Sequence, residues 1–510
     1  MNPVSNKLCT ADEAVANIAD GDWIVSGGFV GAAHPEALTS AIERRFETAG
    51  QPRDLTLVYA AGQGDAKSRG LNHLGHEGLL KRVIVGHWGL APKIGKLAIE
   101  NKIEATNFPQ GVICQILRDI AAGRPGCITH VGLDTFIDPI HRSGRLNDRT
   151  PPGRVERVEL NGRTWLFYHA FPLQVGLIRA TEADCLGNLT MDEEAIIGEV
   201  LPIAQAVRNS GGTVIAQVKR VSDSPAQPHR VAVPAGLVDR IVISEYDEHD
   251  QTFSEAMNLD YVSPYTEMGR ENEDRMPLNA RRIIAARACD ELKPGMLANL
   301  GIGMPEGVAR IAEERGLLQD VTLSLESGPI GGRPAGGLSF GASAFPQAIV
   351  DQPAQFDFYD GGGLDFAALG LAQADASGNV NVSQFGTRLA GVGGFVNISQ
   401  NARSLVFCGT FTSGGLEIEI VGGILRIRKE GRARKFVAAV EQISFSGKRA
   451  IQNGQPVLFV TERAVFRLTE AGLQLIEEAP GVDRQKQILD LMDFDPIIES
   501  VAPMPPHLFE

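Results

Sequence analysis

One stretch of the sequence ends a predicted strand in a glutamate and a glycine-bearing turn. Residues 321–332 read VTLSLESGPIGG, and apolar residues alternate with hydroxyl residues from 321 to 325, which predicts a strand packed on one face. Glu326 follows at once, and Gly328-Pro329 turns the chain. A carboxylate at the C-terminal end of a strand lies where open α/β sheets bind ligands. A solvated turn glutamate would give the same pattern, so the other motifs must decide between the two.

Two other glycine-rich stretches could bring the backbone close to a ligand. Residues 301–306, GIGMPE, begin like a dinucleotide fingerprint but place Glu306 where the third glycine belongs. They are better explained as a tight strand-to-helix turn that offers N–H groups to a ligand. Residues 360–365, DGGGLD, allow a backbone to approach a reacting centre or to take positive φ, with a bulge or turn as the alternative.

Two motifs are set aside. Residues 337–341, GLSFG, fit the nucleophile elbow of serine hydrolases, but Gly-Gly-Arg-Pro-Ala-Gly precedes them and His507 is the only histidine downstream. His73 and His76 could suggest a zinc site, yet the glycine between them disfavours a helix that presents both rings. A loop role is favoured there, and no metal site is predicted.

Composition excludes several classes of partner. A chain of 510 residues has material for two or more domains. Its net charge of −14 argues against nucleic-acid and anionic-membrane partners. No apolar run is long enough to span a membrane, and no signal-peptide core is present. Six scattered cysteines without a CxxC pair indicate reduced thiols, so a cytoplasmic protein is expected.

Strand and helix signals alternate along the chain, which is typical of an α/β fold. A capping box at residues 10–13 opens the first expected helix. The other expected helices cover residues 36–45, 91–100 and 112–122, and the expected strands cover 22–26, 55–59, 82–86, 155–160 and 164–167.

An internal repeat predicts two similar halves. Residues 176–189 match 370–380, residues 202–208 match 397–403, and the loop at 27–36 corresponds to 301–306. A polar, proline-bearing connection centred near residue 265 separates the halves, so we expect domains at 1–260 and 275–510. Only the second half carries Glu326, which suggests chemistry in one half and support from the other.

Taken together, the motifs resemble the family I coenzyme A transferases, in the branch of fused acetate/propionate and 3-ketoacid CoA-transferases. The resemblance runs almost end to end, through residues 27–29, 86–89, 107–111, 121–126, 132–139, 326–328, 361–365 and 460–466. Family members often have Ser-Glu-Asn-Gly around the catalytic glutamate. This chain has Leu325-Glu326-Ser327-Gly328, a variant of the propionate-type branch, which leaves the acyl preference open.

The resemblance implies transfer of CoA between a short-chain acyl-CoA and a carboxylate such as acetate, propionate or a 3-keto acid, as in short-chain fatty acid or ketone body metabolism. Glu326 would be the nucleophile of a ping-pong reaction and would carry a glutamyl-CoA thioester. Gln110 and the N–H of Gly362 would face the oxyanion. The residues implied in substrate or CoA binding are Gly301, Ile302, Gly303, Met304, Gly361 and Gly363.

The implied fold is two similar open α/β domains in tandem, with the active site at their interface. The resemblance also implies a homo-oligomer, a dimer or a tetramer, with no permanently bound cofactor and no metal. CoA would be both substrate and covalent intermediate. Two alternatives stay open: an acyl-CoA hydrolase that uses the same glutamate, and a non-catalytic acyl-CoA binding protein on the same fold.

Overall fold

The computed structural model describes residues 3–267 and 275–510, which form a mixed α/β protein of two compact units. The first unit comprises residues 3–267, 325–357 and 387–397, and the second comprises 275–324, 358–386 and 398–510. Glu326 therefore belongs to the first unit, although it follows the predicted connection in the sequence. The domain limits 1–260 and 275–510 stay a prediction, and residues 268–274 of the connection lie outside the described residues.

The first unit is built on a parallel sheet with the strand order β12-β10-β8-β1-β2-β3-β4. Its strands are β1 (Trp23–Ser26), β2 (Leu55–Tyr59), β3 (Leu80–Val85), β4 (Glu104–Asn107), β8 (Val175–Ala183), β10 (Thr213–Val221) and β12 (Arg240–Ile243). Short strands β9 (Leu189–Thr190) and β11 (Val231–Val233) extend it antiparallel from β8. Every residue of β2 is buried, as expected for a strand covered on both faces.

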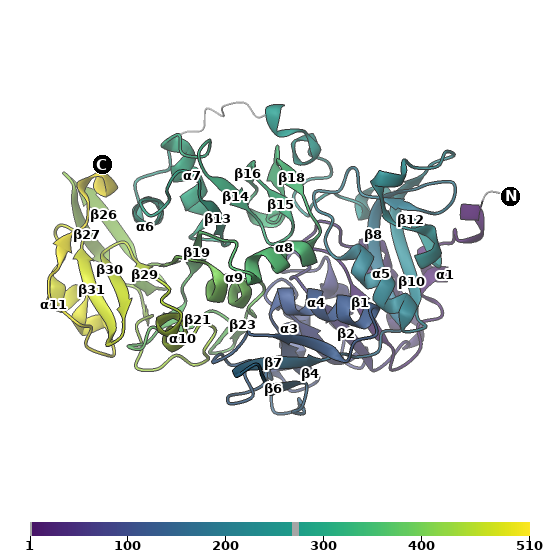
Figure 1. Ribbon diagram of the computed structural model, residues 1–510, viewed down its shortest axis with the longest axis horizontal. Helices are drawn as coiled ribbons and strands as arrows, with labels where there is room; N and C mark the ends of the chain where they lie inside the picture. The colour runs from purple at the N-terminus through teal and green to yellow at the C-terminus, as the bar shows by residue number, and fades with distance from the viewer. Residues whose placement is uncertain (1–2, 268–274) are drawn as a thin grey trace. The chain divides into compact units, whose positions relative to one another are not determined.

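Five helices accompany this sheet: α1 (Ala11–Val15), α2 (Glu36–Ala49), α3 (Pro92–Ile99), α4 (Gln110–Ala121) and α5 (Val200–Asn209). Figure 1 shows α4 and α5 side by side, and they pack against each other, with α5 also against β8. A separate antiparallel sheet of β5 (Gly126–Thr129), β7 (Arg163–His169) and β6 (Val155–Leu160) completes residues 3–267. Residues 325–357 add the short pairs β15 (Pro329–Ile330) with β18 (Ala348–Ile349) and β16 (Arg333–Pro334) with β17 (Ser343–Ala344).

The second unit has a parallel run of strands in the order β14-β13-β19-β24-β29, followed by β30, β31 and β32. Their bounds are β13 (Leu297–Leu300), β14 (Thr322–Ser324), β19 (Phe366–Gly370), β24 (Leu405–Cys408), β29 (Val457–Val460), β30 (Ala464–Thr469), β31 (Gly472–Glu478) and β32 (Ala502–Pro503). Its helices α6 (Ala280–Cys289) and α7 (Glu306–Glu314) pack against each other, and their apolar faces join one buried core with the sheet. Figure 1 shows β29, β30 and β31 as neighbouring strands towards the C-terminus.

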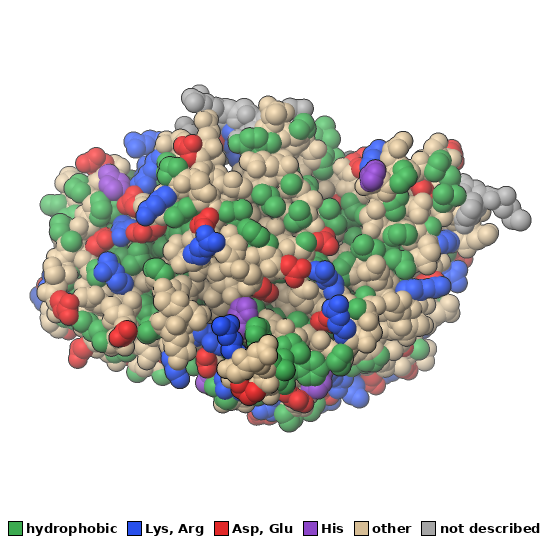
Figure 2. Space-filling model, viewed as in Figure 1, with side chains coloured by type: hydrophobic (Ala, Val, Ile, Leu, Met, Phe, Trp, Pro, Cys, Tyr) green, Lys and Arg blue, Asp and Glu red, His purple; other side chains and the backbone are tan. Residues whose placement is uncertain are grey.

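Smaller elements complete the described chain. They are α8 (Gln352–Asp360), α9 (Phe395–Asn401), α10 (Gly447–Gln452), α11 (Arg484–Gln487), β20 (Gln373–Ala374), β21 (Val380–Asn381), β22 (Gln384–Phe385), β23 (Arg388–Leu389), β25 (Thr412–Ser413), β26 (Glu417–Val421), β27 (Ile424–Lys429) and β28 (Ala433–Arg434). None of the helices in the described residues is long and apolar enough to cross a membrane. On the face drawn in Figure 2, acidic and basic side chains are interspersed among apolar ones.

The internal repeat is visible as two equivalent turns. In the first unit, Asp184 Oδ1 accepts the backbone N–H of Asn188 at 2.8 Å, and Asn188 Nδ2 donates to Asp184 Oδ2 at 2.9 Å. In the second, Asp375 Oδ1 accepts the N–H of Asn379 at 3.1 Å, and Asn379 Nδ2 donates to Asp375 Oδ2 at 3.0 Å. Asp-x-x-Gly-Asn thus specifies the same Asx-type turn in both units.

The expected elements are confirmed with small shifts at their ends. The strands at 55–59 and 155–160 have the predicted limits, and α1 begins at a complete capping box between Thr10 and Glu13. A proline at the first position of a helix is common, because its missing N–H is unpaired there in any case. Instead, Pro35 and Pro305 are the N-cap residues, and α2 and α7 begin at the following glutamates. Helix α2 also runs on to Ala49, where Gly50 ends it with a φ of 66°.

Candidate active site

Glu326 lies in a tight turn directly after β14. The N–H of Leu325 donates to Pro329 O at 2.9 Å, and the N–H of Gly328 donates to Leu325 O at 3.0 Å. These two bonds close the turn around Glu326, which is only 9% exposed. A carboxylate withdrawn from water and held on a fixed turn fits a role in binding or catalysis better than that of a solvated turn residue.

The residues after Glu326 fix the turn. Ser327 Oγ donates to Gly341 O at 2.6 Å, which fastens the turn to the neighbouring loop. Gly328 has a φ of 127°, and a Cβ at this position would lie 2.1 Å from Val350 O. Only glycine fits there, so the Glu-Ser-Gly sequence is explained by how closely two backbones approach.

Gln110, the second predicted site residue, is the first residue of α4. Its backbone N–H donates to Gly393 O at 2.9 Å, and the next N–H, of Gly111, donates to Asn397 Oδ1 at 3.2 Å. The side chain is 2% exposed, and its Nε2 has no hydrogen-bond partner among the described residues. An unmet buried donor costs about 1–3 kcal/mol, so this amide fits a group that receives an oxygen atom of a ligand.

Helix α8 connects the turn of Glu326 with the beginning of α4. Gln355 Nε2 donates to Leu325 O at 3.1 Å, next to Glu326 in the chain. The ring of the following residue, Phe356, lies 2.6 Å from where a Cβ on Gly111 would be. Glu326 and Gln110 are thus held in the first unit by consecutive residues of one helix.

A neutral imidazole lies beside Gln110. Burial and, to a lesser extent, the nearby charge of Arg388 together lower the pKa of His87 to about 4, so His87 is uncharged at neutral pH. Its Cβ and the Oε1 of Gln110 are the side-chain atoms nearest to a Cβ built on Gly393, at 3.7 and 3.5 Å. The imidazole therefore places no positive charge next to the amide.

The segment 301–304 forms the strand-to-helix turn that the sequence predicted. It leaves the carboxyl end of β13, where the N–H of Gly301 donates to Ala368 O at 2.9 Å, and leads into α7. Gly303 has a φ of 86°, and Ile302 is 52% exposed. The turn, with Met304 partly buried at its end, therefore presents backbone to solvent in the second unit.

The glycine run at 361–363 is a helix cap. The N–H of Gly363 donates to Phe358 O and that of Gly362 to Tyr359 O, both at 3.0 Å, which is the Schellman arrangement at the end of α8. Gly362 has the positive φ, 83°, that the motif requires. The turn interpretation is thus confirmed for this run. The N–H of Gly362 is already engaged in this structure, and its assignment to the oxyanion stays a prediction.

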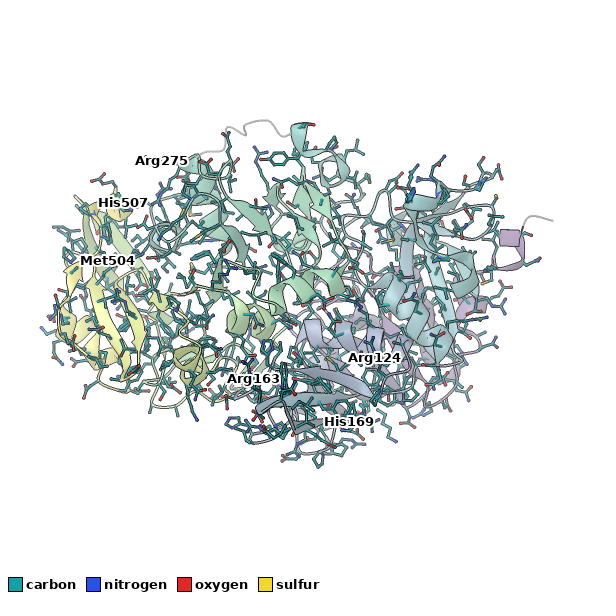
Figure 3. The ribbon with its side chains drawn as sticks, in the orientation of Figure 1. Arg124, Arg163, His169, Arg275, Met504 and His507 are labelled. Carbon is teal, nitrogen blue, oxygen red and sulfur yellow. The ribbon has the colours of Figure 1, made fainter. Side chains whose placement is uncertain are left out.

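The two motifs that were set aside lack the secondary structure that their patterns require. Ser339 Oγ donates to Glu255 Oε2 at 2.6 Å and lies 2.8 Å from Thr252 Oγ1, and strand β17 follows it where an elbow needs a helix. Figure 3 shows His507 close to the end of the chain, where its Nε2 lies 3.2 Å from Asp290 Oδ1. His73 lies in a single 3-10 turn, Leu71–Leu74, that ends before His76.

Reasoning from motifs gave no role to the segment 387–397, which lies over the loop after β3. Asn107 links the two, because its Nδ2 donates to Gly86 O at 2.6 Å and its Oδ1 accepts the N–H of Val392 at 3.1 Å. Gly393 in turn donates its N–H to Gly86 O at 2.7 Å. In the sequence, the one indication of a role for Asn107 is its position three residues before Gln110.

Comparisons with known proteins give matches over most of the chain. The family model described as coenzyme A transferase matches residues 9–244. The acetate CoA-transferase YdiF of Escherichia coli is 41% identical over 493 residues, 96% of this chain and 92% of that protein. The caffeate CoA-transferase of Acetobacterium woodii is 42% identical over 505 residues, 97% of this chain and 95% of that protein.

Solved structures are similar over the same length. A crystal structure of the acyl-CoA transferase YdiF apoenzyme from Escherichia coli matches with a TM-score of 0.93 and 40% identity, covering 100% of this chain and 96% of that one. A thioester complex of the same protein with CoA matches with a TM-score of 0.93 and 39% identity, with the same coverage.

Proposed function

This chain belongs to the coenzyme A transferase family, and from that premise we propose that Glu326 is the nucleophile through which it transfers CoA between an acyl-CoA and a carboxylate. The observation that carries the proposal is the turn of Glu326: a buried carboxylate, closed by backbone hydrogen bonds and tied by α8 to an unpaired amide donor. The chemistry needs only the carboxylate and CoA itself.

Each half-reaction exchanges one bond for another. A carboxylate oxygen of Glu326 attacks the thioester carbonyl carbon of the acyl-CoA, and the C–S bond breaks to give CoA thiolate and an acyl-glutamyl anhydride. The thiolate then attacks the glutamyl carbonyl, which releases the first acid and leaves a glutamyl-CoA thioester. An incoming carboxylate reverses both steps with its own acyl group, so no net proton, metal or redox equivalent is consumed.

The unpaired amide of Gln110 supports a role at the oxyanion. Each attack converts a carbonyl oxygen into an oxyanion, and a donor already in place stabilises it without reorganising. Gln110 Nε2 is buried without a partner in the described structure, so a substrate oxygen would satisfy it. Because His87 beside it is neutral, hydrogen bonding and not a full positive charge would supply this stabilisation.

The exposed turn at 301–304 is proposed as part of the path of CoA, with Gly361 and Gly363 near its reacting end. The turn precedes the N-terminus of α7, where backbone N–H groups favour anionic ligands. Arg281 Nη2 donates to Gly303 O at 2.8 Å and also pairs with Glu306 Oε2 at 3.1 Å, so an arginine–glutamate pair lies beside the turn. Binding energy from the distant nucleotide of CoA would then help bring a weak carboxylate nucleophile onto the thioester.

The acyl donor and acceptor are proposed to be short-chain acids, acetate, propionate or a 3-keto acid. Acetate is the acid in the name of one relative and caffeate in that of another, at almost the same identity, so overall similarity does not choose between small and larger acids. The Leu-Glu-Ser-Gly sequence favours the propionate-type branch.

Three further properties are proposals of the same kind. The active site is expected at the interface of the two domains, as the family resemblance implies. A homo-oligomer, a dimer or a tetramer, is expected from the family and is tested by the solution mass relative to 54.7 kDa. A cytoplasmic location agrees with six free cysteines.

The experiment that tests the function is a panel of acyl-CoAs incubated with and without carboxylates. A transferase consumes acyl-CoA only when an acceptor acid is present, yields the new acyl-CoA and shows ping-pong kinetics. Equal consumption without an acceptor would assign a hydrolase, and binding without turnover would assign a binding protein. Glu326→Gln should abolish turnover, whereas Glu470→Gln, at an exposed glutamate, should match the wild type.

A further inference from the structure

A carboxylate–imidazole cluster lies on α2, outside the proposed active site. Glu43 and Glu47 are one helical turn apart and so face the same side of α2. His73 and His76 approach them from the loop that contains the 3-10 turn Leu71–Leu74. We call these four residues the α2 cluster.

Three members of the cluster have the spacing of metal ligands. One ligand atom from each of Glu43, Glu47 and His76 lies within 4.8 Å of the other two, and His76 Nε2 is 2.7 Å from Glu43 Oε1. An ion with bonds of about 2.0–2.2 Å holds its ligand atoms about 3–3.6 Å apart, so small side-chain rotations would suffice. Glu47 is exposed and His76 is 26% exposed, which leaves both free to rotate and leaves room for water on the ion.

His73, the fourth member of the cluster, orients the carboxylate of Glu43. His73 contacts Glu43 Oε2 through Nδ1, and its Nε2 lies 3.0 Å from Glu36 Oε1. Glu36 is itself fixed, because its Oε2 accepts the N–H of Gly70 at 2.9 Å. The row Glu36–His73–Glu43 has the form of the outer hydrogen bonds that hold a carboxylate ligand in metal sites. A solvated acidic patch would not need a buried carboxylate and an imidazole behind it.

The charges around the cluster permit a cation. Glu43 and Glu47 contribute two negative charges, and the facing cation is Lys93, whose Nζ is 4.0 Å from Glu43 Oε1. Lys93 is 42% exposed and can turn into solvent. Arg69 is paired with Glu36, its Nε lying 3.7 Å from Glu36 Oε1, and not with the three proposed ligands.

We propose that the α2 cluster binds one divalent ion of the zinc or cobalt class through Glu43, Glu47 and His76, with water completing the coordination and His73 positioning Glu43. The imidazole ligand favours such ions over magnesium and calcium, which prefer oxygen. The ion takes the place of the hydrogen shared by His76 and Glu43 and joins α2 to the 71–76 loop. It acts on stability and takes no part in CoA transfer.

The test is a titration of tag-free protein with Co²⁺, followed by visible absorption and by metal analysis after dialysis. One Co²⁺ per chain is expected, displaced by Zn²⁺, together with a higher Tm. Glu47→Gln and His76→Asn should each weaken binding by at least tenfold, and His73→Asn by roughly 10–100-fold as an outer partner.

A matched control is available in the same unit. His169 on β7, labelled in Figure 3, lies 2.9 Å from Glu156, a histidine–glutamate pair that is not part of the cluster. His169→Asn should leave Co²⁺ binding unchanged. Three results would overturn the proposal. The protein could fail to bind millimolar Co²⁺, or both ligand variants could bind it as the wild type does. A thiolate charge-transfer band, which places the ion on a cysteine, would also overturn it. We expect CoA transfer to persist in the presence of a chelator. The outcome of the metal titration is therefore independent of whether the proposed reaction is correct.

Discussion

Replacing Gln110 by methionine separates a catalytic amide from a structural one. Methionine is close to glutamine in length and volume, so the buried space at the start of α4 stays filled, while the unpaired Nε2 is removed. The backbone N–H of residue 110 still donates to Gly393 O. The variant therefore changes one donor and little else.

The two roles give opposite results. If the amide meets the oxyanion, kcat should fall by about 100–1000-fold, which corresponds to about 2.7–4 kcal/mol for one oxyanion donor. Stability should hold or rise, because an unmet buried donor costs the folded protein about 1–3 kcal/mol. If Gln110 only fills space, kcat should stay close to that of the wild type.

The assay is steady-state transfer from acyl-CoA to an acceptor acid at saturating substrate, with Tm measured on the same samples. The matched control is Gln115→Met on the same helix, where Nε2 is already paired at 2.6 Å with Asp357 Oδ1. That control should lose a little stability and keep kcat. A Gln110→Met enzyme with kcat within a factor of a few of the wild type would refute the oxyanion role.

Three further predictions concern the backbone and a buried carboxyl. Gly111→Ala should lower stability by about 1–3 kcal/mol in denaturant unfolding, because its Cβ would lie 2.5 Å from Asn397 Nδ2 in a closed site. Gly362→Ala should cost about 1–2 kcal/mol from the left-handed φ of 83° alone, since its Cβ would make only an ordinary contact, 3.9 Å from Asn401 O; no change in Tm would contradict the cap. Burial raises the pKa of Glu199 to about 8, above the unfolded value of about 4.3, so the folded state holds a proton that the unfolded state releases between these pH values. Stability should therefore fall as pH rises from about 4.3 to about 8, and Glu199→Gln should remove that slope in Tm measured against pH.

Much of the fold could be predicted because its signals are local. The strands at 55–59 and 155–160 were predicted with the limits that β2 and β6 have, and the Thr10–Glu13 capping box gave α1 its start. The repeated Asp-x-x-Gly-Asn turns are also local, since each is closed by its own aspartate. These features can be predicted without knowing which residues pack against them.

The candidate site was only partly predictable because its support is long-range. Glu326 stands out by its turn, but the contacts of Gly111 with Asn397 and Phe356 join residues far apart in the sequence. The same holds for Asn107 and the 387–397 segment. The glycine run at 361–363 is the reverse case, because a short-range helix cap explains a pattern that also fits a reacting centre.

The central claim is that CoA becomes covalently attached to Glu326. Wild-type enzyme incubated with acyl-CoA and no acceptor acid should gain the mass of CoA less water, and peptide mapping should place the adduct on Glu326. Borohydride, which reduces thioesters and spares free carboxylates, should then inactivate only the treated enzyme. An adduct on one of the six cysteines, or an active Glu326→Ala variant, would contradict the account.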